Sequence, residues 1–146
     1  MTKKSVAVIL ASHGSFAKYA LDSAEMIVGK QNNCGVLSVT MDLNLEEATQ
    51  KMTDIYQSLD TSAGTVILVD ILGGTPSNVS GNFCLTKPNV LVISGLNLPM
   101  LLDLFTNRQR SLEEIAESLQ QSYQIGFQNI TERFQEEEQE DDSEIL

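Results

Sequence analysis

The chain has 146 residues, 42% of them hydrophobic, which is typical of a single domain with one sizeable core. It contains no Trp, and no apolar run approaches the roughly 20 residues that a membrane-spanning helix needs. The net charge is −11 and no basic patch could release counterions from a nucleic acid, so the composition argues against nucleic acid as a partner.

Strand and helix patterns alternate along the chain, which is typical of an α/β fold. Four short apolar runs are expected to be strands, because continuous runs rich in Val, Ile and Leu suit parallel strands that are buried on both faces. These strands are predicted at residues 6–11, 35–40, 64–70 and 89–94.

Segments with helical spacing follow the predicted strands. The first has an apolar stripe that includes Ala17, Ala24 and Ile27, with Ser15 as a plausible N-cap and Gly29 as a stop. Asn44, Asn97 and Ser111 stand before later helices, and Glu47 occupies the capping-box position after Asn44. Helices are therefore predicted at residues 16–30, 45–59 and 76–85, in a segment ending near 106, and at 111–122.

The C-terminal region contains an ambiguous segment and an acidic one. In residues 123–131, Gly126 interrupts a helical pattern, and Ile125 and Phe127 alternate as strand residues do, so a fifth, edge strand is expected. From Glu132 to Leu146 there are eight acidic residues and one basic residue. We therefore expect a domain over residues 1–131 and an acidic helix or tail over 132–146.

His13 is the only histidine and lies just after the first predicted strand, separated from it by Ser12. A single imidazole cannot build a histidine metal site, but it can act as a nucleophile, a proton carrier or a phosphate carrier. Ligands of open α/β sheets bind at the carboxyl ends of strands, where the strand order reverses. If the order is 2-1-3-4, His13 and Asp70 end adjacent strands, and Asp70 can accept one ring N–H and fix the tautomer.

The sequence Gly73-Gly74-Thr75-Pro76 follows Asp70 closely. The glycine pair allows close approach of a ligand to the backbone, while Thr75 fits an N-cap and Pro76 the first helical position. Free N–H groups at a helix N-terminus form an anion site. An imidazole, an orienting carboxylate and an anion site in one crevice predict the handling of phosphoryl groups.

The two cysteines, Cys34 and Cys84, lie far apart and lack CxxC spacing. We interpret them as reduced thiols in a reducing cytoplasm. No metal and no cofactor is expected.

Four motifs together resemble the enzyme IIA component of the mannose family of the bacterial sugar phosphotransferase system. They occupy residues 8–14, 24–29, 69–78 and 95–101, and the resemblance extends over residues 5–130. The expected fold is a flavodoxin-like three-layer α/β sandwich with a mainly parallel sheet of order 2-1-3-4.

The resemblance implies that His13 accepts a phosphoryl group from phosphorylated HPr and passes it to enzyme IIB. Asp70 would hydrogen-bond the imidazole, and Thr75 would hold the phosphate where Ser is usual. Backbone groups of Gly14, Gly73 and Gly74 would complete the phosphate site. Leu72 replaces an aromatic residue that is often seen in this loop.

The resemblance also implies a homodimer in which a C-terminal edge strand crosses to the partner, and residues 123–131 fit that strand. Family members often continue into a IIB domain, whereas this chain ends in acidic residues, so IIB is expected to be a separate protein. Contact with the membrane components IIC and IID would be indirect, and the protein would be cytoplasmic.

Other functions remain open from the sequence. The phosphotransferase subunit of a dihydroxyacetone kinase shares this fold and a histidine after the first strand. A nucleotide- or flavin-binding module is a second alternative, although GxGxxG and Walker A motifs are absent. A regulatory domain that signals through phosphorylated His13 is a third. The sugar is not identified, and mannose, fructose, sorbose, gluconate and amino sugars all fit.

Overall fold

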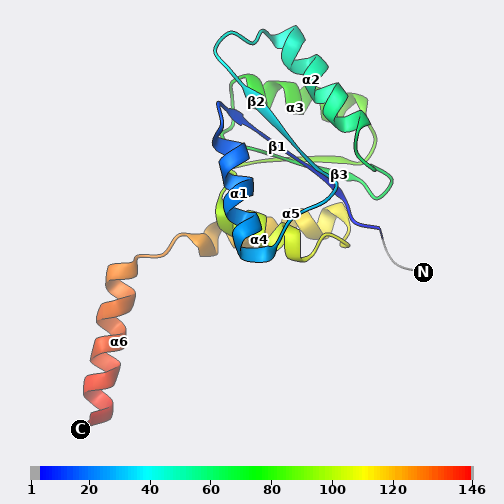
Figure 1. Cartoon of the computed structure of the whole chain (residues 1–146). Coiled ribbons are helices and arrows are strands. Elements are labelled where there is room, and N and C mark those ends of the chain that lie inside the picture. Colours follow the sequence, from blue (N-terminus) through cyan, green and yellow to red (C-terminus); the bar gives the residue numbers. More distant parts are fainter. Residues whose placement is uncertain (1–3, 146) are drawn as a thin grey trace.

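The four apolar runs form a single parallel sheet of order β2-β1-β3-β4 in the computed structural model, which describes residues 4–145 (Figure 1). Its strands are β1 (Ala7–His13), β2 (Cys34–Val39), β3 (Thr65–Val69) and β4 (Val90–Ser94). This order confirms the predicted flavodoxin-like arrangement, in which the strand order reverses between β1 and β3.

Helices cover both faces of the sheet and complete a three-layer sandwich (Figure 1). The helices α1 (Phe16–Val28), α4 (Leu98–Thr106) and α5 (Leu112–Gly126) cover one face, and α2 (Leu45–Gln57) and α3 (Thr75–Thr86) cover the other. Successive side chains of a strand point to opposite faces, so Val8 and Leu10 join the first core while Ile9 and Ala11 join the second. This double burial explains the continuous apolar runs.

Two predicted helix caps, Asn44 and Asn97, are confirmed, and Ser111, expected as the start of a helix, proves to be a third cap. Asn44 accepts a hydrogen bond from the amide of Glu47, Asn97 accepts one from Met100, and Ser111 forms a full capping box with Glu114. Each of these side chains satisfies an amide that lacks a partner within its own helix.

Two other helix starts and one apolar position differ from the prediction. Ser15 precedes α1 but makes no capping hydrogen bond, and Ser12 caps the helix instead. Gly74 is the N-cap of α3, so Thr75 is the first helical residue. Ile27 was expected to face the core but is 59% exposed, because the stripe of α1 that packs on the sheet is narrow and made mostly of alanines.

The predicted edge strand over residues 123–131 is wrong for the single chain. Helix α5 continues to Gly126, and α6 (Ile130–Ile145) begins four residues later. The physical reason lies at Gly126, where a Cβ would come within 2.7 Å of Pro99 Cγ. The glycine that resembles a helix breaker thus lets the last turn of α5 pack closely against α4.

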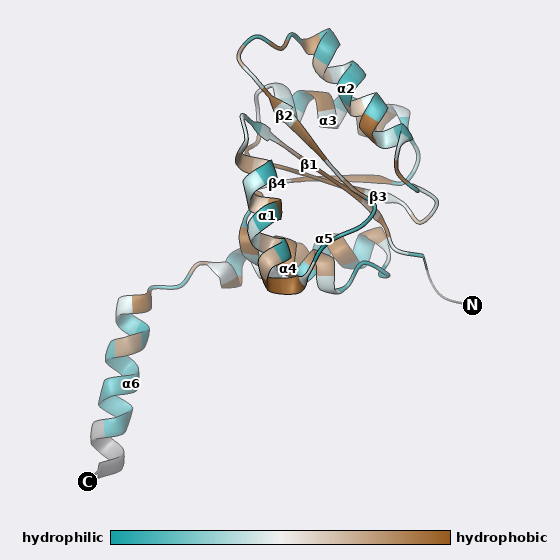
Figure 2. Ribbon diagram, viewed as in Figure 1, coloured by the Kyte–Doolittle hydropathy of each residue, from teal (hydrophilic) through white to brown (hydrophobic). Residues whose placement is uncertain are grey.

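Helix α6 projects away from the sandwich, and its surface is largely hydrophilic (Figures 1 and 2). Its side chains are exposed from Ile130 to Asp141. The acidic segment is therefore helical over the described residues, and Leu146 lies outside them. Within residues 4–145, no helix is both long and apolar enough to cross a membrane.

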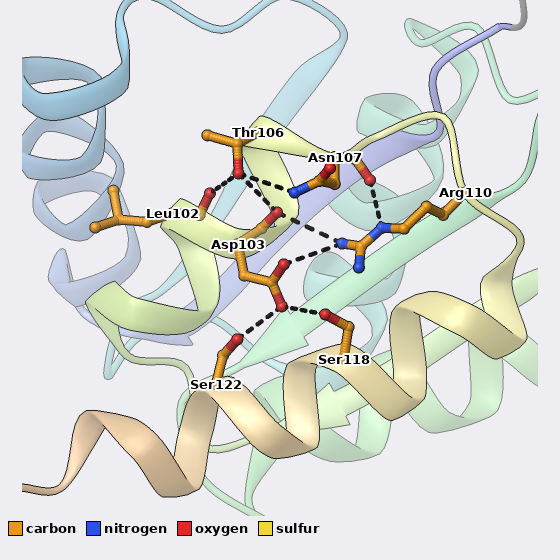
Figure 3. Close-up of polar contacts among 7 residues, drawn as sticks. All are labelled: Leu102, Asp103, Thr106, Asn107, Arg110, Ser118 and Ser122. Carbon is orange, nitrogen blue, oxygen red and sulfur yellow. Dashed lines mark hydrogen bonds and ion pairs between the residues drawn. The ribbon is translucent and has the colours of Figure 1, made fainter.

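Asp103 joins α4 to α5 through three side-chain contacts (Figure 3). Its Oδ2 accepts hydrogen bonds from Ser118 Oγ at 2.6 Å and Ser122 Oγ at 2.7 Å, and Arg110 Nη2 lies 3.2 Å from Oδ1. Burial raises the pKa of Asp103, but the two hydroxyl donors and Arg110 outweigh it and hold this pKa below its usual value. The ionised carboxylate therefore stabilises the packing of α5 against α4, beside the edge strand β4.

We expect Asp103→Asn to lower the free energy of unfolding by about 1–3 kcal/mol at pH 7, because hydrogen bonds to a charged acceptor are lost. The carboxylate contributes stability above its unfolded pKa of about 3.9 and loses it as the pH falls through the lower folded pKa. The difference from wild type should therefore shrink at pH 3. Urea unfolding at both pH values measures it. Asp22→Asn, an exposed change on α1, is the control, and equal stability of wild type and Asp103→Asn at pH 7 would contradict the assignment.

Candidate active site

His13 and Asp70 meet at the carboxyl edge of the sheet because β1 and β3 are adjacent and parallel, with Ala11 paired to Val69. Asp70 Oδ2 lies 2.8 Å from His13 Nδ1 and accepts a hydrogen bond from the backbone N–H of His13 at 2.9 Å. The other carboxylate oxygen, Oδ1, accepts from the amide of Ile71 at 2.9 Å. One side chain therefore fixes both the backbone and the ring of the histidine.

This geometry determines which ring nitrogen can react. Because Asp70 faces Nδ1, the neutral ring places its proton there and leaves the lone pair on Nε2. The side chain of His13 is 51% exposed, whereas that of Asp70 is only 13% exposed. The carboxylate is therefore a sheltered support, and the imidazole can be reached from outside.

Asp70 is ionised at neutral pH. Burial alone would raise its pKa, but hydrogen bonds from the backbone and ring of His13 and from the amide of Ile71 together hold the pKa below its usual value. A negative charge therefore stands beside Nδ1 and can balance positive charge that develops on the ring.

The glycine pair lies directly beside the reactive nitrogen. Gly73 and Gly74 have φ values of 90° and 84°, a region that favours glycine. A Cβ on Gly74 would lie 3.0 Å from His13 Nε2 and 3.1 Å from Cε1, while one on Gly73 would have no neighbour within 4 Å. The backbone at Gly74 therefore faces Nε2, and the first turn of α3, with Thr75, begins there.

Gly14, which was expected to take part in the phosphate site, has its backbone N–H engaged within the fold. Its N–H donates to the carbonyl of Val39 at 2.8 Å, which ties the turn after β1 to β2. Its φ of 58° explains why glycine stands here, since few other residues adopt this conformation readily. The structure thus brings together His13, Asp70, Gly74 and Thr75, and it gives Gly14 a role in the turn.

The sequence prediction also missed Ser12. This residue is fully buried, and its Oγ accepts a hydrogen bond from the Ala17 amide at 2.8 Å and donates to the Gly14 carbonyl at 3.2 Å. A usable signal was present, because Ser12 is a polar residue between the apolar run of β1 and the histidine.

The cysteines lie away from this site. Both thiols are free and half-buried, and burial raises the pKa of Cys34 to about 11, which keeps it protonated and unreactive. Among the described residues, no three His, Cys, Asp or Glu side chains come together in a way that could hold a metal ion.

Comparison with known proteins gives consistent matches. The family model EIIA-man, described as the fructose IIA component of the PTS, matches residues 7–122. The mannose-specific EIIAB component of Escherichia coli K12 is 34% identical over 70% of this chain and 32% of that protein. The sorbose-specific EIIA component of Klebsiella pneumoniae is 32% identical over 79% of this chain and 84% of that protein.

A solved structure matches as well. The mannose/sorbose-specific IIA subunit from Enterococcus faecalis has a TM-score of 0.79 at 31% identity, covering 86% of this chain and 95% of that one. The present chain spans about a third of the length of the Escherichia coli relative.

We expect Gly74→Ala to displace the His13 ring, whereas Gly73→Ala leaves it in place. Both changes put a side chain on a residue with positive φ, at a cost of about 1–3 kcal/mol each, but only the new Cβ at position 74 meets the ring. The chain has one histidine, so its imidazole NMR signals are unambiguous. Those signals should shift clearly in Gly74→Ala only. Equal shifts in both variants would show that the backbone at Gly74 does not face Nε2.

Proposed function

We propose that this chain, which belongs to the EIIA-man family of phosphotransferase-system IIA components, carries a phosphoryl group on His13 during sugar uptake. The observation that carries the proposal is the double contact of Asp70 Oδ2 with His13, which leaves Nε2 unprotonated and facing the Gly74 backbone. The donor would be phosphorylated HPr and the acceptor enzyme IIB.

The chemistry follows from this arrangement. The Nε2 lone pair attacks phosphorus, the Nε2–P bond forms, and the P–N bond to the donor histidine breaks with its electron pair returning to the donor. The proton on Nδ1 stays where it is throughout. The ring becomes cationic as the bond forms, and the neighbouring Asp70 carboxylate offsets this charge.

The phosphoryl oxygens need fixed donors more than they need acid–base chemistry. We assign this role to the backbone at Gly73 and Gly74 and to Thr75, where α3 begins with amides that have no partner within the helix. The positive end of α3 also favours the negative phosphoryl group. Transfer to enzyme IIB is the same step in reverse, with a new nitrogen as the acceptor.

Exposure of the site suits exchange between proteins. His13 is half exposed, and around the same edge of the sheet Phe16, Ile71 and Leu72 are 52%, 58% and 85% exposed. Exposed apolar side chains beside a reactive group favour docking of a protein partner. We place the chain in the cytoplasm, with the membrane components IIC and IID reached only through enzyme IIB.

The comparisons support a sugar system over the alternative functions. The relatives are named as mannose-specific and sorbose-specific PTS components and the family is described as a fructose component, and none of these names refers to dihydroxyacetone or flavin. The names differ among themselves in the sugar, which fits a subunit that contacts proteins and not the sugar.

We expect wild-type protein to become labelled when it is mixed with HPr phosphorylated from radioactive phosphoenolpyruvate by enzyme I. His13→Ala should take up no label, because it lacks the accepting nitrogen. Labelling of His13→Ala equal to wild type would overturn the proposed function. Absence of label on folded wild type would do the same.

Asp70→Asn serves as the matched variant in this experiment, because it keeps the size of the side chain and removes its charge. It should be labelled about 10- to 100-fold more slowly, as expected for loss of about 1.5–3 kcal/mol from a charged hydrogen bond. A circular-dichroism spectrum equal to that of wild type shows that the slow rate is not due to unfolding.

We also propose a homodimer in which the segment after α5 covers the outer edge of β4 in a second copy. Within the described residues β4 pairs only with β3, and a hollow of about 440 Å³ beside it is lined by Ile93, Met100 and Tyr123 among others. Ile125 and Phe127 are 68% and 84% exposed in the single chain. Apolar residues and an unpaired strand edge both favour such a cover.

Phe127→Asp should convert the dimer to a monomer in analytical ultracentrifugation, because it places a charge in the proposed contact. Leu85→Asp, an equally exposed apolar position on α3, should leave the dimer intact. Equal masses for the two variants would contradict this proposal.

A further inference from the structure

We propose that Ser12 is a positioning residue that holds His13 in its reactive place, an inference that rests on the phosphocarrier function proposed above. Ser12 lies between Ala11 and His13 at the end of β1 and is fully buried. It does not reach the reacting atoms, and it acts through the turn that carries the histidine.

The hydroxyl of Ser12 bridges the two ends of this turn. Its Oγ donates to the carbonyl of Gly14 at 3.2 Å and accepts from the amide of Ala17 at 2.8 Å. Ser15, the residue directly before α1, makes no side-chain capping bond. Helix α1 is therefore capped by a residue on the other side of the histidine, which links the strand to the helix across the active turn.

Each part of the turn is held by a different neighbour. Asp70 on the β3 side holds the amide and ring of His13, and the Val39 carbonyl of β2 holds the amide of Gly14. Ser12 makes the third set of contacts, hydrogen bonds with the carbonyl of Gly14 and with the Ala17 amide at the start of α1. The turn is thus fixed to β3, β2 and α1 at once.

Loss of the hydroxyl would release the most adaptable part of the turn. Gly14 has a positive φ and no Cβ, so its backbone can rotate once its carbonyl is released. Ala17 is fully buried, so its amide cannot easily take water as a substitute partner and the start of α1 must rearrange. Both changes move the backbone that carries the imidazole, while Asp70, just after β3, and Gly74, just before α3, stay in place.

Small displacements matter at this site. Misplacement by about 1 Å can slow a reaction about 100-fold, because in-line transfer requires the attacking atom at one position. The Nε2 atom lies close to the Gly74 backbone. A shift of the turn that carries His13 would therefore change the distance from Nε2 to the groups proposed to bind the phosphoryl oxygens. Docking of a partner depends on the outer surface, which the buried Ser12 does not touch.

The test compares Ser12→Ala with wild type in steady-state transfer of phosphoryl groups from phosphorylated HPr to enzyme IIB, so that each chain turns over repeatedly. We expect kcat to fall about 10- to 100-fold and KM for phosphorylated HPr to stay within twofold, with shifted His13 imidazole NMR signals. Thermal unfolding should show a modest decrease in Tm, and the assay is run well below it so that the variant is folded. A residue that only stabilised the helix would lower Tm without changing kcat of the folded protein.

Two further variants complete the design. Ser15→Ala removes the hydroxyl at the nominal cap and should transfer at the wild-type rate. Ser12→Cys keeps the size of the side chain but weakens both hydrogen bonds, and it should also lower kcat. It takes the place of Ser12→Ala if that variant does not fold.

The outcomes separate this inference from the function on which it rests. If wild type accepts no phosphoryl group, the proposed function fails. If wild type is labelled and the folded Ser12 variants transfer within twofold of it, only the positioning role fails. If neither Ser12 variant folds, the residue serves folding and the inference is overturned.

Discussion

The contact of Asp70 Oδ2 with both the backbone and the ring of His13 is the interaction on which the rest of the site depends. It requires β1 and β3 to be adjacent and parallel, since only then do the two residues end at the same edge. It also places the ring proton on Nδ1 and turns Nε2 towards Gly74. The sheet order is therefore the precondition of this contact, and the tautomer and the direction of attack follow from one carboxylate oxygen.

A phosphate carrier must satisfy two opposing demands, and the structure divides them between residues. The histidine has to be exposed to meet one protein and then another, yet its ring must not rotate freely. Asp70 and Ser12 are largely or fully buried and hydrogen-bond to the turn from the protein interior, while His13 itself is half exposed. Most of the excess acidic charge lies on α6, which projects away from the sandwich (Figure 1).

The strands could be predicted from their apolar runs, whereas their order 2-1-3-4 was expected from the family resemblance. Given that order, the rule that sites form where the strand order reverses predicted the His13–Asp70 pair. The engaged amide of Gly14 and the capping role of Ser12 could not be predicted, because they depend on which group lies nearest across a turn. The length of α5 was missed for a similar reason. Gly126 breaks the helical pattern in sequence, but its missing side chain is what allows contact with Pro99. At Gly14, Ser12 and Gly126, a contact with another part of the fold determined the structure, and the local sequence pattern did not reveal that contact.

The most direct test of the central claim is the position of the phosphoryl group on the ring. Protein labelled with ¹⁵N at His13 and phosphorylated by HPr can be examined by NMR, in which the ¹⁵N shifts and the coupling to ³¹P identify the bonded nitrogen. Since Asp70 occupies Nδ1, we expect the phosphoryl group on Nε2 with a proton retained on Nδ1. A phosphoryl group on Nδ1 would contradict the account, because it would require the contact with Asp70 to break.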